Sequence, residues 1–273
     1  MDSICLNTSE SEMTFNENEI ILLLSGGRDS FLSACYLLDQ NPDCHLNMVT
    51  FDNGCSLQSE NAKTVADRII DRYGKNRADY LGVYLISSTI REFFLPYFNL
   101  KPIELAERYP GLTPSQFHCL ICRVSMYINA IWLGYLHHAA IIAEGGRKDQ
   151  EFVIEQPGMA QERLCALVEA VGMKQVLPVY DLSDDLVRDH ELLHRGFFCK
   201  TYEPKCLIGV PVQGSVDETV IQSVQNYYDD HILPIIQKRE LLYFRNDPQY
   251  ASKNRNKANS YLSRENDFNE LVR

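Results

Sequence analysis

The stretch E-I-I-L-L-L-S-G-G-R-D-S, residues 19–30, decides the fold of this 273-residue chain. Its first half, residues 19–24, is a continuous apolar run, as expected for a short strand covered on both faces. Two adjacent glycines follow, and residues 31–38 then carry apolar side chains at helical spacing: Phe31, Ala34, Cys35 and Leu38. The sequence therefore predicts a buried strand, a glycine loop and a helix in immediate succession.

The same alternation continues along the chain. Strands are predicted over 45–51, 80–86, 139–143 and 175–180, and helices over 59–73, 119–138, 159–171, 183–194 and 216–236. This order indicates an α/β fold with a mainly parallel sheet flanked by helices and a C-terminal helical extension. We expect a flexible leader over residues 1–18, a catalytic domain over 19–212, and the extension and tail over 213–273.

The composition excludes some classes of protein. Apolar residues make up 45% of the chain, and 26 basic against 37 acidic residues give a formal charge of −11. No continuous apolar run approaches the roughly 20 residues that span a bilayer, and the first 18 residues lack a secretory pattern. We therefore expect a cytoplasmic protein that does not cross a membrane. The acidic balance argues against broad coating of nucleic acid, though not against a local basic site.

The loop over residues 25–30 has the groups that hold a phosphate. Gly26 and Gly27 let the backbone turn tightly and direct its N–H groups at a ligand, while Ser25 and Ser30 add hydroxyls. The carboxylate of Asp29 would repel a bare phosphate, but it fits if Mg²⁺ lies between them. The loop matches neither G-x-x-x-x-G-K-[ST] nor G-x-G-x-x-G. A plain turn between a strand and a helix also remains open.

The nine cysteines need a second explanation, because disulfides are rare in a reducing compartment. Cys119 and Cys122 form a C-x-x-C at the predicted start of a helix, where the positive helix end favours thiolate. They suit a redox pair, half of a zinc site, ligands of an iron–sulfur cluster, or two buried core side chains. Further metal ligands would come from Cys199 and Cys206. The other five have no ligand-like spacing and are expected to be structural: Cys5, Cys35, Cys44, Cys55 and Cys165.

The S-G-G-x-D-S pattern between an apolar strand and a helix resembles the signature of the PP-loop, or N-type ATP pyrophosphatase, superfamily. The resemblance covers residues 19 to about 210 and implies an adenine nucleotide alpha-hydrolase-like fold. It further implies cleavage of ATP between the α- and β-phosphates and adenylation of a substrate carbonyl oxygen, after which a nucleophile displaces AMP. Asp29 would hold Mg²⁺, and Phe51, after the second strand, would pack against adenine. The pyrophosphate would lie on Ser25, Gly26, Gly27, Arg28 and Ser30.

The cysteine spacing is similar to that of the iron–sulfur-dependent tRNA thiolation enzymes of this superfamily. That resemblance implies a [4Fe–4S] cluster on Cys119, Cys122 and Cys206, whose open iron carries a sulfide that attacks the adenylated base. Adding Cys199 gives four sulfurs, which is also the ligand set of a closed zinc site. The alternatives are therefore a zinc-containing 7-cyano-7-deazaguanine synthase-like or amidating enzyme, or a nucleotide-binding module without chemistry.

Two features depart from those thiolases. Residues 144–149, E-G-G-R-K-D, replace a loop containing His and Asp, although Gly145 allows close backbone approach and Asp149 offers a carboxylate to Mg²⁺. A polar loop without a ligand has the same composition. The tRNA enzymes also tend to be basic, so the acceptor nucleobase belongs either to tRNA or to a small molecule. A sulfur-donor protein and a second copy of the chain are the other partners that the resemblance allows.

Overall fold

The computed structural model describes residues 14–97, 100–148, 153–154, 156–182, 184–208 and 217–237. Its centre is a five-stranded sheet with the order β4-β2-β1-β5-β6, in which every neighbouring pair is parallel. The strands are β1 (Asn16–Leu23), β2 (His45–Asp52), β4 (Ala78–Leu85), β5 (Ala139–Ala143) and β6 (Lys174–Val176). The predicted α/β fold with a parallel sheet is confirmed.

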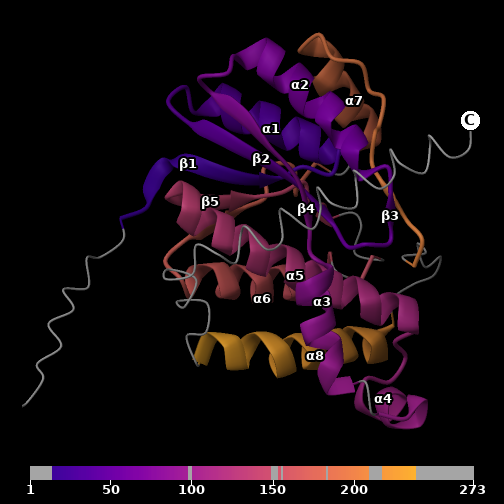
Figure 1. Ribbon diagram of the computed structural model, residues 1–273. Coiled ribbons are helices and arrows are strands. Elements are labelled where there is room, and N and C mark those ends of the chain that lie inside the picture. The colour runs from indigo at the N-terminus through magenta and orange to yellow at the C-terminus, as the bar shows by residue number, and fades with distance from the viewer. Residues whose placement is uncertain are drawn as a thin grey trace, which may run out of the picture.

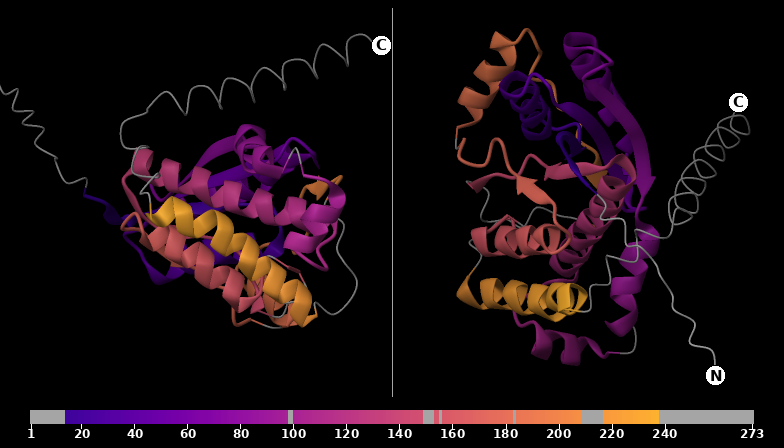
Figure 2. Two further views of the ribbon diagram at one scale, coloured as in Figure 1. Left: turned by 90° about the horizontal axis from the view of Figure 1, so that it is seen from below. Right: turned by 90° about the vertical axis from the view of Figure 1, so that its left-hand side faces the viewer.

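Helices cover both faces of this sheet (Figure 1). One face carries α1 (Arg28–Gln40), α2 (Ala62–Tyr73) and α7 (Asp185–His194). The other carries α3 (Ser87–Phe94), α5 (Pro114–His137) and α6 (Gly158–Glu169). Helix α8 (Glu218–Gln237) lies against α6 on the side away from the sheet, as Figure 1 and the right-hand view of Figure 2 show. The short elements are η1 (Ser59–Asn61), η2 (Leu95–Tyr97) and α4 (Pro102–Arg108).

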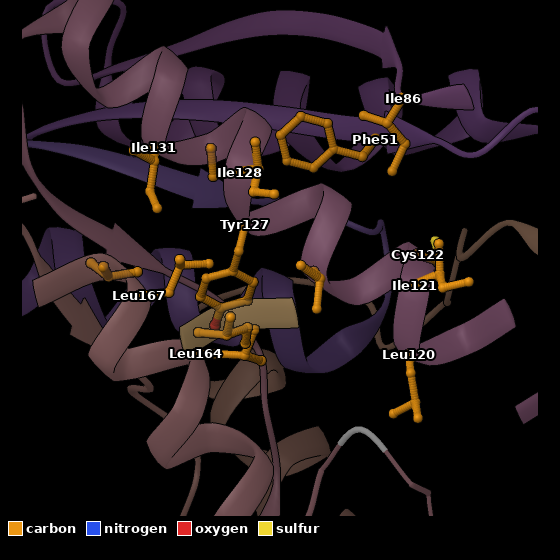
Figure 3. Close-up of a cluster of buried hydrophobic side chains, with 14 of the residues drawn as sticks. Phe51, Ile86, Leu120, Ile121, Cys122, Tyr127, Ile128, Ile131, Leu164 and Leu167 are labelled. Atoms are coloured by element: carbon orange, nitrogen blue, oxygen red, sulfur yellow. The ribbon is translucent and has the colours of Figure 1, made fainter. Parts of the chain in front are cut away.

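The side chains of β1 supply both halves of the core, because successive residues of a strand point to opposite faces. Ile20 and Leu22 pack with the helices α1 and α2, whereas Ile21 and Leu23 join the core around α5. This double burial explains the continuous apolar run at residues 19–24. Figure 3 shows the second core, in which Phe51 lies near α5 and Tyr127 points from α5 toward α6.

Several boundaries differ from the sequence prediction. Strand β1 begins at Asn16, so it includes residues 16–18 of the segment expected as a leader. The Asn16 N–H donates to the carbonyl of His138 at 2.7 Å, which ties this end of the strand to the chain before β5. Strand β6 is shorter than predicted and ends at Val176. The rest of the expected leader, residues 1–13, and the tail from residue 238 lie outside the described residues.

Helix α5 starts five residues before its predicted start at Cys119, and the expected position of the cysteines at the helix terminus is wrong. Thr113 caps the helix: its side chain accepts from the Gln116 N–H, and Gln116 in turn accepts from the Thr113 N–H. Pro114 takes the first helical position, where its missing N–H costs nothing. Cys119 and Cys122 therefore lie beyond the first turn, to which the favourable effect of the helix dipole is confined.

Of the described helices, α5 alone is long and apolar enough to cross a membrane, by length and composition. Most of that stretch, 78%, is buried inside the fold. It packs between the sheet and α6, and Trp132 and Tyr127 are among the largest fully buried side chains. Figure 3 shows Tyr127 in this core. These contacts are those of a core helix.

The extension predicted after residue 212 packs into the same core as the sheet. The buried side chains of α8 belong to the cluster built around α5: Val220, Val224, Tyr227, Tyr228 and Ile232. A second, two-stranded antiparallel sheet joins β3 (Ser56–Leu57) to β7 (Lys205–Cys206). This pairing brings a late segment of the chain to the carboxyl end of β2.

Candidate active site

A pocket of about 340 Å³ lies at the carboxyl ends of the parallel strands. In open parallel sheets this edge binds ligands, next to the point where the strand order reverses. Here β2 and β5 lie on opposite sides of β1, so the loop after β1 lies at that point. The residues that line the pocket include two sets with different chemistry. One set comprises Ser25, Gly27, Asp29, Ser30, Gly145 and Glu203. The other, which we name the thiol set, comprises Asn53, His118, Cys119, Cys122 and Cys206.

The glycine loop is shaped by its own hydroxyl groups. The hydroxyl oxygen of Ser25 accepts from the Gly27 N–H at 3.1 Å and lies 3.1 Å from the hydroxyl of Ser30. Gly26 has φ +83°, and a Cβ there would lie 3.0 Å from the carbonyl oxygen of Tyr202, so both backbone and space require glycine. Helix α1 starts after Gly27 without a side-chain cap. An anion can therefore take the place of the cap.

The loop after β5 touches the backbone of α1. A Cβ on Gly145 would lie 2.5 Å from the Ser30 nitrogen and 2.7 Å from the Asp29 carbonyl carbon. Neither atom can move without displacing the helix start. Gly145 thus lies directly against the backbone at the start of α1, and its expected role beside a ligand stays a prediction. Asp149, the carboxylate expected beyond this loop, lies outside the described residues.

Asp29 is held between two arginines from distant parts of the chain. Its carboxylate lies 3.3 Å from the Arg147 guanidinium and 3.2 Å from that of Arg188, which is fully buried. Both arginines also contact Asp185, at the start of α7. Burial nevertheless raises the pKa of Asp29, and the arginines only partly oppose this. The site therefore holds a desolvated carboxylate with cations beside it, which suits a metal ion bound to phosphates.

Arg28 does not line the pocket. Its guanidinium lies 2.8 Å from Asp189 and 3.2 Å from Asp185, both on α7. Asp185 and Asp189 thus bind arginines from α1, from the loop after β5 and from α7 itself. Cys199 lies on this side too, with its thiol 3.2 Å from the Asp189 carbonyl oxygen. The structure brings Cys119, Cys122 and Cys206 to one pocket and does not bring Cys199 there.

Asn53 links two of the three cysteines in the pocket. Its Nδ2 lies 3.6 Å from the sulfur of Cys122 and 3.4 Å from the sulfur of Cys206. Cys206 reaches this position through β7, because it pairs with Ser56 immediately after the β2 turn. No role was predicted for Asn53 from the sequence. An asparagine following a strand at the carboxyl edge was its one available sign.

Cys119, Cys122 and Cys206 are chemically suited to bind an iron–sulfur cluster, because thiolates are its usual ligands. They line the same pocket as the glycine loop. Among the described residues, however, no three His, Cys, Asp or Glu side chains converge closely enough to form a metal site. All eight cysteines in this part of the chain are free thiols. Three candidate ligands thus line one pocket, but their side chains are not arranged around a single metal position.

Phe51 reaches the pocket but belongs mainly to the core. Its side chain is 7% exposed, and its ring lies beside Ile86 and near Ile128 of α5 (Figure 3). Phe51 is nevertheless among the residues that line the pocket. The expected contact with adenine can therefore involve only a small part of the ring.

Two other charged groups in the pocket were missed by sequence reasoning: the pair Arg123 and Glu144, and Glu203. Arg123, directly after the C-x-x-C, forms a buried ion pair with Glu144 at the end of β5. The carboxylate of Glu203 approaches Gly27, since a Cβ there would lie 3.3 Å from its Oε2. Desolvation and the charge of Asp29 raise the pKa of Glu203. His118, 6% exposed, has its pKa lowered by burial. Their positions next to the C-x-x-C, the β5 end and Cys206 were the available signs.

No protein-family model matches the sequence, and a search of curated proteins finds no match either. Similar folds occur among solved structures. A 4-thiouridine synthetase in complex with RNA and ATP is 16% identical, with a TM-score of 0.48, over 82% of this chain and 53% of that one. The chain thus spans about half the length of that protein.

Two other structures align over most of this chain. The U34-tRNA thiolase NcsA from Methanococcus maripaludis, with its [4Fe-4S] cluster, is 16% identical, with a TM-score of 0.41, over 84% of this chain and 71% of that one. NMN synthetase from Francisella tularensis is 12% identical, with a TM-score of 0.45, over 86% of both chains.

Proposed function

We propose that this protein is an ATP pyrophosphatase of the PP-loop type that adenylates a carbonyl oxygen of a nucleobase and then transfers sulfur to that carbon. One observation carries the proposal: a single pocket is lined both by the glycine loop and by Cys119, Cys122 and Cys206. An activating group and a sulfur-bearing group must reach the same carbon. A pocket that is lined by both the glycine loop and the three thiols meets that requirement.

In the first step, the substrate oxygen attacks the α-phosphorus of ATP and pyrophosphate leaves. The hydroxyls of Ser25 and Ser30 and the first N–H groups of α1 would bind the pyrophosphate. Asp29 would hold Mg²⁺ against it, and Arg147 and Arg188 would balance the charge that develops on the leaving group. This step converts a poor leaving oxygen into AMP.

In the second step, sulfur replaces AMP at the activated carbon. Cys119, Cys122 and Cys206 are the residues that would hold a [4Fe–4S] cluster, which when bound would supply the sulfur nucleophile. Arg123 and His118 also line the pocket and would contact the acceptor nucleobase. We also propose a cytoplasmic location, because such thiols persist in a reducing compartment; cell fractionation tests it.

Pyrophosphate release tests the first step. Anaerobically purified protein is incubated with ATP, Mg²⁺ and either bulk tRNA or free nucleobases, and pyrophosphate and AMP are measured. Asp29→Ala is expected to lower the rate about 100-fold, because the metal contributes several kcal/mol to charge stabilisation. Asp43→Ala, in an exposed turn after α1, is the matched control. ATP binding with no AMP or pyrophosphate under any condition would instead favour a nucleotide-binding module.

Metal analysis tests the second step. Iron, acid-labile sulfide and visible absorbance are measured on anaerobic protein. Serine replacement of Cys119, Cys122 or Cys206 is expected to remove most of the iron. Cys199→Ser should retain it, because this thiol lies on the α7 side of the loop, away from the pocket. Protein without iron or cluster absorbance contradicts the sulfur-transfer step, and stoichiometric zinc would favour an amidating enzyme.

A further inference from the structure

Asn53 makes four hydrogen-bond contacts through one carboxamide. Its Oδ1 accepts from the Cys55 N–H at 2.8 Å and from the Ser56 hydroxyl at 3.0 Å. Its Nδ2 contacts the sulfurs of Cys122 and Cys206, at 3.6 and 3.4 Å. The side chain is only 8% exposed, so water cannot readily replace these partners.

The chemistry of these partners fixes the orientation of the amide. A backbone N–H can only donate, so the atom that faces Cys55 must be the carbonyl oxygen. The NH₂ group then faces the sulfurs, and its two hydrogens are enough for one to each. Asn53 therefore presents donors, and no acceptor, to the two thiols.

The contact also has a mechanical role, because Cys206 lies on a strand of only two residues. Strand β7 pairs with β3 through two residue pairs, Ser56 with Cys206 and Leu57 with Lys205. Such a short ribbon has little stability of its own. Cys122, by contrast, lies in the long and buried helix α5. Asn53 follows β2 and contacts the sulfur of Cys122 as well as that of Cys206.

We propose that Asn53 is a positioning residue that holds the sulfurs of Cys122 and Cys206 together and stabilises negative charge on both. The inference rests on the proposed function, in which these sulfurs are ligands. Hydrogen bonds to sulfur tune the properties of a bound cluster, and outer partners of metal ligands change metal affinity about 10–100-fold. Asn53 would thus contact the ligand sulfurs and not the cluster itself, and would act through Cys122 and Cys206.

A dithiol-specific trivalent arsenical tests the spatial part of the proposal without ATP or cluster. It forms two As–S bonds with neighbouring thiols and releases water, with no change in oxidation state. In a Cys119→Ser background, the apo-protein is expected to join Cys122 to Cys206, as read by peptide mapping. Asn53→Asp keeps both acceptor contacts but turns an anionic oxygen toward the sulfurs. The rate of joining should fall at least about tenfold.

Cobalt binding tests the electronic part. Apo-protein with all cysteines intact is titrated with Co²⁺, and the sulfur-to-cobalt charge-transfer band reports thiolate ligation. Asn53→Asp is expected to weaken Co²⁺ binding about 10–100-fold and to shift this band. Asn53→Ser, which keeps a hydroxyl that can accept from Cys55, serves where the aspartate variant does not fold. The matched control is Asn129→Asp: Asn129 is a buried asparagine on α5 that contacts Thr89 and Ser125.

The results separate this inference from the proposed function. Loss of arsenical joining in the Asn53 variants, with joining retained in Asn129→Asp, supports the positioning role even if wild-type protein forms no cobalt–thiolate band. In that case the cluster, and not Asn53, is the part that fails. Equal joining rates and equal Co²⁺ affinity in folded Asn53 variants and wild type would overturn the inference.

Discussion

At the scale of single residues, the candidate site depends on places where only glycine fits. Gly145 is the sharpest case, because its missing side chain would overlap two backbone atoms of α1, and backbone cannot move aside as a flexible side chain can. The loop after β5 and the start of α1 are thereby held in contact. A side-chain atom added at Gly145 would therefore push the loop after β5 away from the start of α1.

We therefore predict that Gly145→Ala weakens both folding and ATP binding. Overpacking at such a site costs about 1–3 kcal/mol of unfolding free energy, which urea denaturation measures. ATP affinity, from equilibrium dialysis, should fall because the N–H groups of α1 are displaced.

Gly158→Ala is the control for Gly145→Ala. Gly158 is the first residue of α6, and the nearest atom to a Cβ there, the hydroxyl oxygen of Tyr180, is 4.0 Å away. This variant should stay within about 0.5 kcal/mol of wild type. A Gly145 variant that behaves like the Gly158 variant would show that the loop and helix can separate without loss.

At the scale of elements, α8 is attached through a network of polar groups within an aromatic cluster. The Tyr97 hydroxyl is hydrogen-bonded to His231 Nε2 and lies 2.8 Å from the Tyr109 hydroxyl. Tyr109 in turn donates to Asp230 at 2.8 Å, and Asp230 also binds Arg108. Burial lowers the pKa of His231 from 6.5 to about 4, with the Asp230 charge opposing and Arg108 adding to this effect.

This pKa predicts that α8 docking weakens in acid. The unfolded chain binds a proton on His231 near pH 6.5, whereas the folded chain does so only near pH 4. The full contribution is thus present above pH 6.5 and is lost as the pH falls toward 4, by on the order of 3 kcal/mol. Urea unfolding at a series of pH values measures the slope.

His231→Gln should flatten this part of the stability profile, since the variant has no group that titrates there. His190→Gln, at an exposed position on α7, should keep the wild-type slope. An unchanged slope in His231→Gln would mean that other groups cause the acid sensitivity.

At the scale of the whole molecule, one continuous core joins the sheet to the outermost helix. Helix α5 contacts the sheet and also α6. Helix α8 packs against α6 on the side away from the sheet (Figures 1 and 2). The only tryptophan, Trp132, lies in this core and is 2% exposed. Its fluorescence therefore reports on the centre of the molecule.

We predict that damage in α8 is felt at Trp132. Val224 is 1% exposed, so Val224→Asp buries a charge and should cost about 3 kcal/mol or more. The unfolding curves followed by tryptophan fluorescence and by far-ultraviolet circular dichroism should both move to lower urea concentrations, by the same amount. Gln222→Asp, on the exposed side of α8, is the control. If only the circular dichroism curve shifted, α8 would be an independent extension.

The sequence by itself determined the alternation of strands and helices, the parallel sheet and the glycine loop after β1. Those features depend on local periodicity, and a parallel sheet gathers the ends of its strands at one edge whatever the side chains are. The start of α5 was also encoded locally, in Thr113, Pro114 and Gln116, although the sequence prediction placed it at Cys119.

Only the tertiary structure decided which side chains meet. It separates Cys199 from the other candidate ligands, pairs Arg28 with α7, and places Asn53 between Cys122 and Cys206. The sequence does not specify these contacts, because each joins residues far apart in the chain. Which partners meet depends on how layers and short ribbons such as β3–β7 pack, and packing involves the whole core at once.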